Sequence, residues 1–221
     1  MRNFKRITLL CGHYGSGKTN IAVNMAVELR KQRDNVAVAD LDIVNPYFRT
    51  KDSSDLFEDN GIRLIVSKYA NSNVDIPALP QDIYSITDDT SLSVIIDVGG
   101  DDRGALALGR LAKPIMEEND YEMLFVINCY RPLTRDAEST MEVMHEIECA
   151  SKMKFTGIVN NSNLGELTTA DDVMNSVEYA KEVSQLSKLP IVNTTVNENI
   201  YNDLCDKIEN LLPLSLQAKP V

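Results

Sequence analysis

The chain has 221 residues, 43% of them hydrophobic and 25% charged, so it is long enough to bury the core of one globular domain. Its formal net charge is −11, which argues against a broad surface for nucleic acid. No run approaches the roughly eighteen apolar residues of a membrane-spanning helix, so no membrane association is expected. The four cysteines lie far apart without a C-x-x-C pair, and we therefore expect reduced thiols and a cytoplasmic location.

The first predicted element is a buried strand, RITLLC at residues 6–11, which leads directly into a glycine-rich segment. That segment, GHYGSGKT at residues 12–19, matches the phosphate-binding pattern G-x-x-x-x-G-K-[ST]. A helix is predicted over residues 17–33, because apolar residues recur there at four-residue spacing. Strand, loop and helix in this order are the context that the pattern requires.

Each residue type in this loop has a use in binding phosphate. Glycines let the backbone turn its N–H groups toward an anion, and the following helix directs the positive end of its dipole to the same point. Lys18 is predicted to reach the terminal phosphates, and Thr19 is predicted to ligate a magnesium ion. The predicted nucleotide-binding loop comprises Gly12, His13, Tyr14, Gly15, Ser16, Gly17, Lys18, Thr19 and Asn20.

Further apolar runs alternate with helical stretches along the rest of the chain. The runs are NVAVADL, IRLIVS, SVIIDV, EMLFVIN, FTGIVN and a short PIVNTTV. Helices are predicted over 103–119, 134–151, 169–188 and 198–212, with Thr134 and Thr169 as N-caps. The pattern predicts an α/β fold with a mostly parallel sheet of about seven strands and helices on both faces. We treat residues 1–221 as one P-loop domain, in which residues 44–91 form an irregular polar excursion with one clear strand.

Acidic and glycine residues follow two of the predicted strands, where parallel sheets bind ligands. Asp40 and Asp42 end the second strand and share one side of it, so they could hold the magnesium shell or orient an attacking water. Solvated acids at a strand end are the alternative. Asp97 ends an apolar run in the Walker B pattern, which supplies a carboxylate to magnesium. Gly99 and Gly100 would let the backbone approach a γ-phosphate and respond to its loss, or they form a flexible turn.

These motifs together resemble the MinD/ParA family of deviant Walker P-loop ATPases, the branch that includes nitrogenase iron protein and the CobQ/CobB synthetases. The segments GHYGSGKT, VAVADLD, SVIIDVGG and FTGIVNN carry the resemblance, which covers most of the chain outside 44–91. The resemblance implies ATP and Mg²⁺ as ligands and a homodimer that closes around two nucleotides. By position, the resemblance implies that Lys18 binds the phosphates, that Thr19 and Asp97 ligate magnesium and that Asp42 orients the attacking water.

The resemblance also implies contacts with the base. Asn161 lies where relatives use an asparagine to hydrogen-bond the adenine edge, although an asparagine after a strand is also common turn chemistry. Val196 and Asn197 lie in a segment similar to the loop that packs against the base.

One position departs from the family pattern. Relatives carry a lysine that reaches the partner subunit's nucleotide, giving lysine-glycine-glycine, whereas this chain has His13, Tyr14 and Gly15. An ordinary imidazole is mostly neutral at cytosolic pH, although bound phosphate would raise its pKa. Arg49 and Arg103 lie near predicted strand ends, so each is a further candidate for the missing charge or simply a surface arginine.

Three functions remain open at this stage. The favoured one is a magnesium-dependent ATPase that switches residues 44–91 and the segment after Asp97 and acts on a protein partner. The second is a synthetase or kinase that transfers phosphoryl to a small-molecule acceptor, which needs no lysine from a partner. The third is a nucleotide-dependent binding module with negligible turnover. Guanine specificity is disfavoured, because the N-K-x-D motif is absent after FTGIVN.

Overall fold

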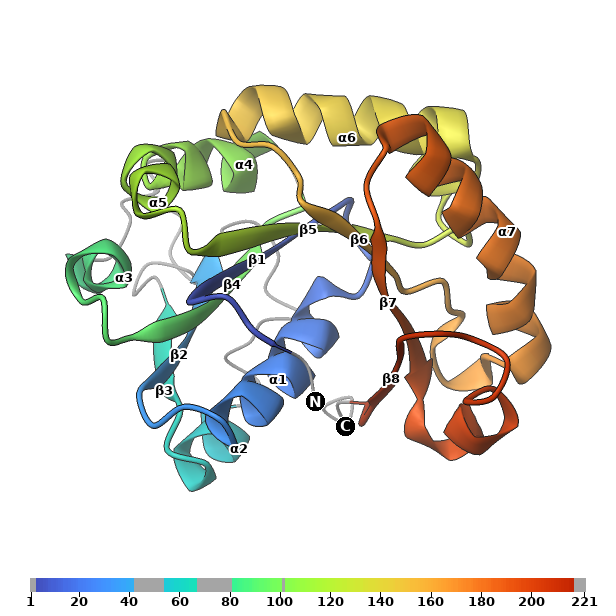
Figure 1. Cartoon of the computed structure of the whole chain (residues 1–221), viewed down its shortest axis with the longest axis horizontal. Helices are drawn as coiled ribbons and strands as arrows, with labels where there is room; N and C mark the ends of the chain where they lie inside the picture. Colours follow the sequence, from blue (N-terminus) through green and yellow to red (C-terminus); the bar gives the residue numbers. More distant parts are fainter. Residues whose placement is uncertain (1–2, 42–53, 67–80, 101, 217–221) are drawn as a thin grey trace, which may run out of the picture.

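The computed structural model describes residues 3–41, 54–66, 81–100 and 102–216. In these residues, one sheet has the strand order β3-β2-β4-β1-β5-β6-β7-β8, and every pairing in it is parallel (Figure 1). The strands are β1 (Ile7–Cys11), β2 (Val36–Leu41), β3 (Arg63–Val66), β4 (Ser93–Val98), β5 (Tyr121–Ile127), β6 (Gly157–Asn160), β7 (Ile191–Asn197) and β8 (Leu211–Leu214). The predicted α/β class and parallel sheet are confirmed, with eight strands in place of about seven.

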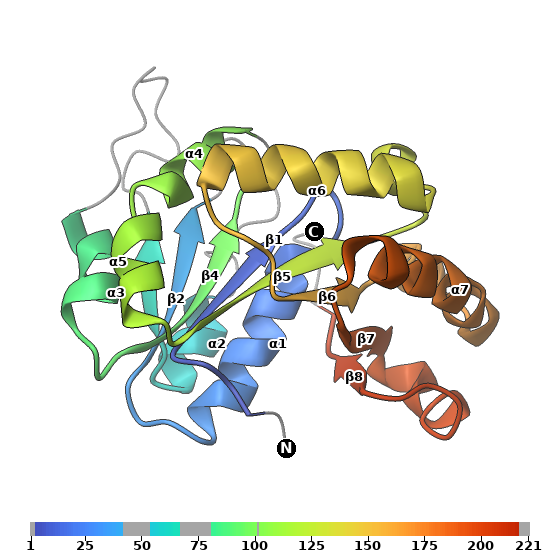
Figure 2. The same cartoon turned by 45° about the horizontal axis from the view of Figure 1, so that its top comes forward.

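Helices connect the strands and cover both faces of the sheet (Figures 1 and 2). The α-helices are α1 (Lys18–Arg30), α2 (Ser54–Asp59), α3 (Ser85–Asp88), α4 (Asp102–Gly109), α5 (Ala112–Glu118), α6 (Ala137–Ser151) and α7 (Ala170–Ser187). Short 3-10 helices are η2 (Gln81–Tyr84), η3 (Pro132–Thr134), η4 (Gly165–Leu167) and η5 (Glu198–Asp203). No helix in the described ranges is both long and apolar enough to cross a bilayer.

The core has one layer on each side of the sheet. On one face, α1 and α2 pack against alternate strand residues, with Met25 and Phe57 in the same buried cluster as Val38 and Ile95. On the other face, residues of α3 to α7 pack against the intervening strand positions. All residues of β1, β2 and β4 are consequently buried, which explains why their sequences are continuous apolar runs.

Two of the predicted helices are wrong. The helix predicted over 103–119 is divided into α4 and α5, because Pro114 has no N–H to continue a helix and is tolerated only in the first turn of a new one. The helix predicted over 198–212 is instead η5, a turn and β8. β8 contains Pro213 and forms the edge of the sheet, where a proline costs no ladder hydrogen bond on its open side.

The N-cap of α6 is also not the predicted one. Asp136 caps this helix by accepting a hydrogen bond from the Ser139 N–H, whereas Thr134 ends η3 and donates its hydroxyl to the Asn128 carbonyl at 2.7 Å. Thr169 caps α7 as predicted, in a reciprocal capping box with Asp172.

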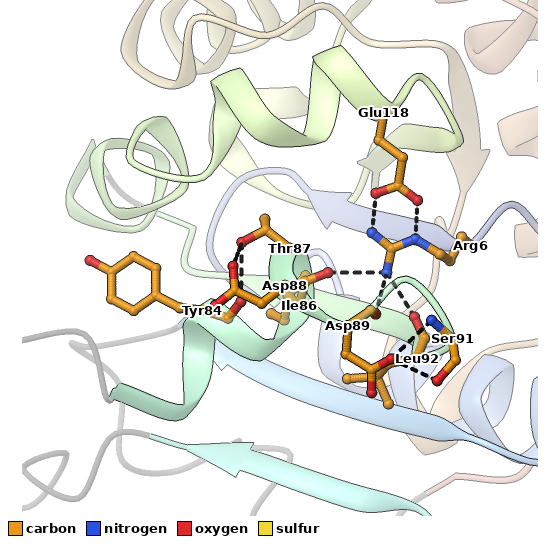
Figure 3. Close-up of polar contacts among 9 residues, drawn as sticks. All are labelled: Arg6, Tyr84, Ile86, Thr87, Asp88, Asp89, Ser91, Leu92 and Glu118. Carbon is orange, nitrogen blue, oxygen red and sulfur yellow. Dashed lines mark hydrogen bonds and ion pairs between the residues drawn. The ribbon is translucent and has the colours of Figure 1, made fainter.

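A buried arginine joins several elements at the beginning of β1 (Figure 3). The Arg6 guanidinium makes a two-point ion pair with Glu118 at the end of α5. Its third nitrogen donates to the Ile86 carbonyl at 3.0 Å and to the Leu92 carbonyl at 2.8 Å. Arg6 therefore fastens α3, α5 and the start of β4 to the end of the sheet opposite the glycine-rich loop.

Candidate functional site

The glycine-rich loop joins β1 to α1 and depends on glycine at specific positions. Gly12, Gly15 and Gly17 have φ angles of 154°, 77° and 88°, which residues with side chains rarely adopt. A Cβ atom on Gly12 would also collide with the Val126 carbonyl, and one on Gly17 with the Asn161 side-chain amide. The loop thus has a conformation that only glycine permits, pressed against the ends of β5 and β6.

Lys18 is folded back over this loop. Its side chain is 6% exposed, and its Nζ donates to the carbonyls of Gly12 at 2.9 Å and His13 at 3.2 Å. These bonds hold the ammonium at the rim of the loop, at the end of the sheet where parallel strands bind ligands.

The predicted magnesium-binding side chains of the loop and of β4 lie together. Thr19 donates its hydroxyl to an Asp97 carboxylate oxygen at 2.6 Å, and Asp97 is 1% exposed. Asp40 is the register partner of Asp97 on the adjacent strand β2, so the two side chains point to the same face of the sheet. Asp42 lies outside the described residues. Hydroxyl and carboxylate oxygens are thereby gathered beside Lys18.

Asn161 bridges the loop and β7. Its side-chain amide donates to the Ser16 carbonyl at 2.5 Å, and its side-chain oxygen accepts a hydrogen bond from the Thr195 hydroxyl. Asn161 is 5% exposed and borders the cavity described below. The predicted base-contacting residue therefore touches the phosphate-binding loop directly.

A cavity of about 470 Å³ opens beside the loop. Tyr14, Gly15, Gly17, Lys18, Thr19 and Asn20 line one side of it. The other sides are formed by the segment after β6, which includes Asn163 and Glu166, and by the ends of β7 and β8. Val196 and Asn197, predicted to lie against the base, are both in the β7 wall.

Two buried asparagines that the sequence analysis did not select shape the cavity wall. The Asn128 side-chain oxygen, at the end of β5, accepts from the N–H of Tyr130 at 3.0 Å and of Asn163 at 3.3 Å. The Asn160 side-chain oxygen, at the end of β6, accepts from the N–H of Ser162 at 3.2 Å. Their position at strand ends was the available signal, because ligand-binding loops begin there.

His13 is not among the residues that line the cavity. Its Nδ1 lies 3.0 Å from the Tyr14 carbonyl. Burial lowers the pKa of His13 below its ordinary value and nearby Lys18 lowers it further, although the Tyr14 hydrogen bond opposes them. The neutral imidazole is therefore the main form at neutral pH, which weakens His13 as a replacement for a lysine.

The predicted switch glycines pack on the loop. A Cβ atom on Gly100 would approach the Tyr14 nitrogen to 2.5 Å, so the segment after β4 lies directly against the loop backbone. A Cβ atom on Gly104 would approach Gly99 Cα to 2.6 Å, which ties the same segment to α4. Movement of the loop and of this segment would consequently be coupled through close backbone contacts.

Neither arginine that the sequence analysis proposed as a replacement for the missing lysine can be placed at the loop. Arg49 lies outside the described residues, and Arg103 lies in α4, where only its backbone is described. Arg131, which the sequence analysis did not select, reaches the loop: its Nε donates to the Gly15 carbonyl at 2.9 Å. Within the described part of the chain, no cluster of three or more His, Cys, Asp or Glu residues could hold a metal.

Comparison with known proteins agrees with this architecture. The sequence matches the family described as the CobQ/CobB/MinD/ParA nucleotide binding domain over residues 7–211. No curated protein matches the chain significantly.

Similar folds occur in solved structures of FtsY. That of Mycoplasma mycoides has a TM-score of 0.56 and 20% identity over 87% of this chain and 60% of that one. FtsY of Elizabethkingia anophelis, in complex with GDP, has a TM-score of 0.53 and 15% identity over 99% of this chain and 62% of that one. Chloroplast FtsY of Physcomitrella patens has a TM-score of 0.60 and 14% identity over 90% of this chain and 60% of that one. The chain spans about 60% of the length of these proteins, and at these identities the likeness concerns the fold. Because the family match extends over most of the sequence, the chain belongs to the CobQ/CobB/MinD/ParA nucleotide-binding domain family and is a P-loop NTPase by fold.

Proposed function

We propose that this chain is a magnesium-dependent ATPase of the MinD/ParA type that acts in the cytoplasm as a nucleotide-controlled switch on a protein partner. The observation that carries the proposal is the contact of 2.6 Å between Thr19 and Asp97, beside Lys18 at the mouth of the cavity. It combines a cation for phosphate with oxygens for a divalent metal, the two components that P-loop phosphoryl transfer requires.

The residues present fit a magnesium ion. Mg²⁺ prefers oxygen ligands and is commonly held by one or two protein side chains together with substrate phosphates. Thr19 and Asp97 would hold it, and the ion would neutralise charge on the phosphates. Lys18 would hold the phosphates themselves, and Asp42 is proposed to orient the attacking water.

Adenine is the base we propose. The segment after β6 reads Asn161, Ser162, Asn163 and Leu164, so it lacks the lysine and aspartate of the guanine-reading motif. The bound GDP of one FtsY structure keeps guanine as the alternative to be tested. Asn161, Val196 and Asn197 border the same cavity as Thr19 and are proposed to contact the base.

The test is phosphate release from ATP and from GTP, each with and without Mg²⁺, by the wild-type protein and by Lys18→Ala. We expect release from ATP that requires both Mg²⁺ and Lys18. Equal or faster release from GTP would overturn the base assignment, and release that survives Lys18→Ala would overturn the site.

A phosphoryl-transferring synthetase or kinase is the second candidate, favoured by His13 in the place of the family's partner-reaching lysine. A site without the partner-reaching lysine has no evident need for a second subunit. Sedimentation of Asp42→Ala with Mg-ATP and with Mg-ADP separates the two functions. A dimer formed only with ATP supports the switch, whereas an assembly state indifferent to nucleotide supports the synthetase or kinase.

A further inference from the structure

Arg131 is a cation at the site that the motifs leave unexplained. It follows β5 and precedes Pro132, which confines it to an extended backbone conformation, and its φ and ψ are −110° and 139°. Its N–H donates to the Asn128 carbonyl at 3.1 Å, and its carbonyl accepts from the Thr134 N–H at 3.1 Å. The backbone from which this side chain extends is therefore fixed on both sides.

The side chain lies along the glycine-rich loop. Its Nε donates to the Gly15 carbonyl at 2.9 Å. A Cβ atom on Gly15 would be 3.4 Å from Nε and 3.6 Å from the central guanidinium carbon, so the group rests against the loop backbone. Arg131 also lines the cavity, together with Lys18 and Thr19.

The charge of Arg131 has no acidic partner among the residues that the structure describes. Within the same ranges, Nε is its only side-chain nitrogen that donates a hydrogen bond. The neighbouring Arg135 behaves differently, because its Nε pairs with Asp136 at 3.2 Å. Arg131 thus presents an unneutralised guanidinium to a cavity that borders a phosphate-binding loop.

We propose that Arg131 is a phosphate-binding residue of the same subunit, holding the α- and β-phosphates of the nucleotide. This inference rests on the proposed function. Guanidinium groups suit phosphate because they offer several N–H donors in one plane. Because the positive charge of Arg131 belongs to the same chain as the loop, one subunit can bind nucleotide without a second copy.

The position of Arg131 selects the inner phosphates. Thr19 and Asp97, the proposed metal ligands, mark the end of the site where the terminal phosphate lies in P-loop proteins. Arg131 bonds to Gly15, in the middle of the glycine-rich loop, and lines the same cavity as Val196 and Asn197, the proposed base contacts. The phosphates between these two ends are those nearest the nucleoside, which ATP and ADP share.

The test separates the charge of Arg131 from its bond to the loop. In Arg131→Gln, the side-chain NH₂ occupies the topological position of Nε, so the hydrogen bond to Gly15 can persist while the charge is lost. Arg135→Gln is the matched control, because it removes an equal charge from the same segment outside the cavity. Dissociation constants for Mg-ATP and Mg-ADP are measured for wild type, both variants and Lys18→Ala, with a thermal melt of each.

We expect Arg131→Gln to weaken the binding of ATP and of ADP alike by about tenfold, and Arg135→Gln to bind both as the wild type does. Affinities of Arg131→Gln equal to those of Arg135→Gln would overturn the inference. A loss confined to ATP would overturn the assignment to the inner phosphates.

The same experiment distinguishes this inference from the proposed function. Wild-type binding that depends on Lys18 but not on Arg131 leaves the proposed function standing and removes the inference alone. Absence of nucleotide binding by the wild type overturns both.

Discussion

A buried cation lies near each end of β1, and the two cations have different partners. We call the start of β1 the structural end and the glycine-rich loop beyond its other end the ligand end. Arg6, 7% exposed, lies at the start of the strand and pairs with the Glu118 carboxylate and several backbone carbonyls (Figure 3). Lys18, 6% exposed, lies beyond the end of the strand, donates to two carbonyls of its own loop and borders a cavity. Arg6 is thus bonded to groups inside the protein at the start of the strand, whereas Lys18 lies at a cavity that a ligand anion can enter.

Breaking the structural end should produce the largest loss of stability. We expect Arg6→Ala to lower the free energy of unfolding by about 3 kcal/mol, because it leaves the Glu118 carboxylate without its partner in a largely buried place. Urea unfolding measures this loss. Lys5→Ala is the control, since its ion pair with Asp120 is about half exposed and should contribute little. Equal losses in the two variants would contradict the structural role of Arg6.

Substitutions at the ligand end should reduce nucleotide hydrolysis and leave most of the free energy of unfolding unchanged. Thr19→Val deletes the hydroxyl that contacts Asp97, and we expect the Mg²⁺-dependent hydrolysis rate to fall about 100-fold. Thr8→Val is a matched control, because Thr8 in β1 also donates to a carboxylate, that of Glu122 in β5 at 2.8 Å, and neither residue lines the cavity. A Thr19→Val enzyme with normal Mg²⁺ dependence would remove Thr19 from the metal site.

Loosening the contact between the loop and the base side should have an intermediate effect. Asn161→Ala removes the bonds to the Ser16 carbonyl and to Thr195, and we expect nucleotide affinity to fall about tenfold. We also expect a smaller preference for ATP over GTP, which competition binding measures. An unchanged preference with lower affinity would limit Asn161 to bracing the loop.

The protonation of His13 should have the smallest effect. Because the pKa of His13 is lowered in the folded chain, the unfolded state binds more protons between that pKa and about 6.5. The folded state therefore loses stability as the pH falls through this window, and His13→Gln should remove that part of the loss. At pH 7.5 we expect His13→Gln to bind ATP within about twofold of wild type, since the imidazole is neutral there. A large loss at this pH would restore His13 as a phosphate ligand.

Local patterns predicted the backbone of the glycine-rich loop and of its flanking strand and helix well, because each of these parts depends on neighbours in sequence. Gly12, Gly15 and Gly17 satisfy backbone requirements of one short loop, and the strand and helix around it have clear apolar periodicity. These features need no knowledge of distant segments. The contact of Thr19 with Asp97 spans 78 positions, and the Walker B pattern at the end of a buried strand was the signal for it.

The features that were missed depend on tertiary contacts. Leu211–Leu214 is too short to show a period, and it is a strand because β7 offers an open edge. Arg131 lies 116 positions from Gly15, so no local pattern connects them, although its place after β5 was a usable signal. The ion pair of Arg6 with Glu118 spans 112 positions and carries no motif.

The most direct measurement is a calorimetric titration of Mg-ATP into the wild-type protein and into Lys18→Ala, with Arg6→Lys as a variant altered at the structural end. The account predicts saturable binding at one site by the wild type and by the folded fraction of Arg6→Lys, and no measurable binding by Lys18→Ala. Binding of equal strength by Lys18→Ala, or no binding by the wild type, would contradict the assignment of the loop and its cavity to nucleotide.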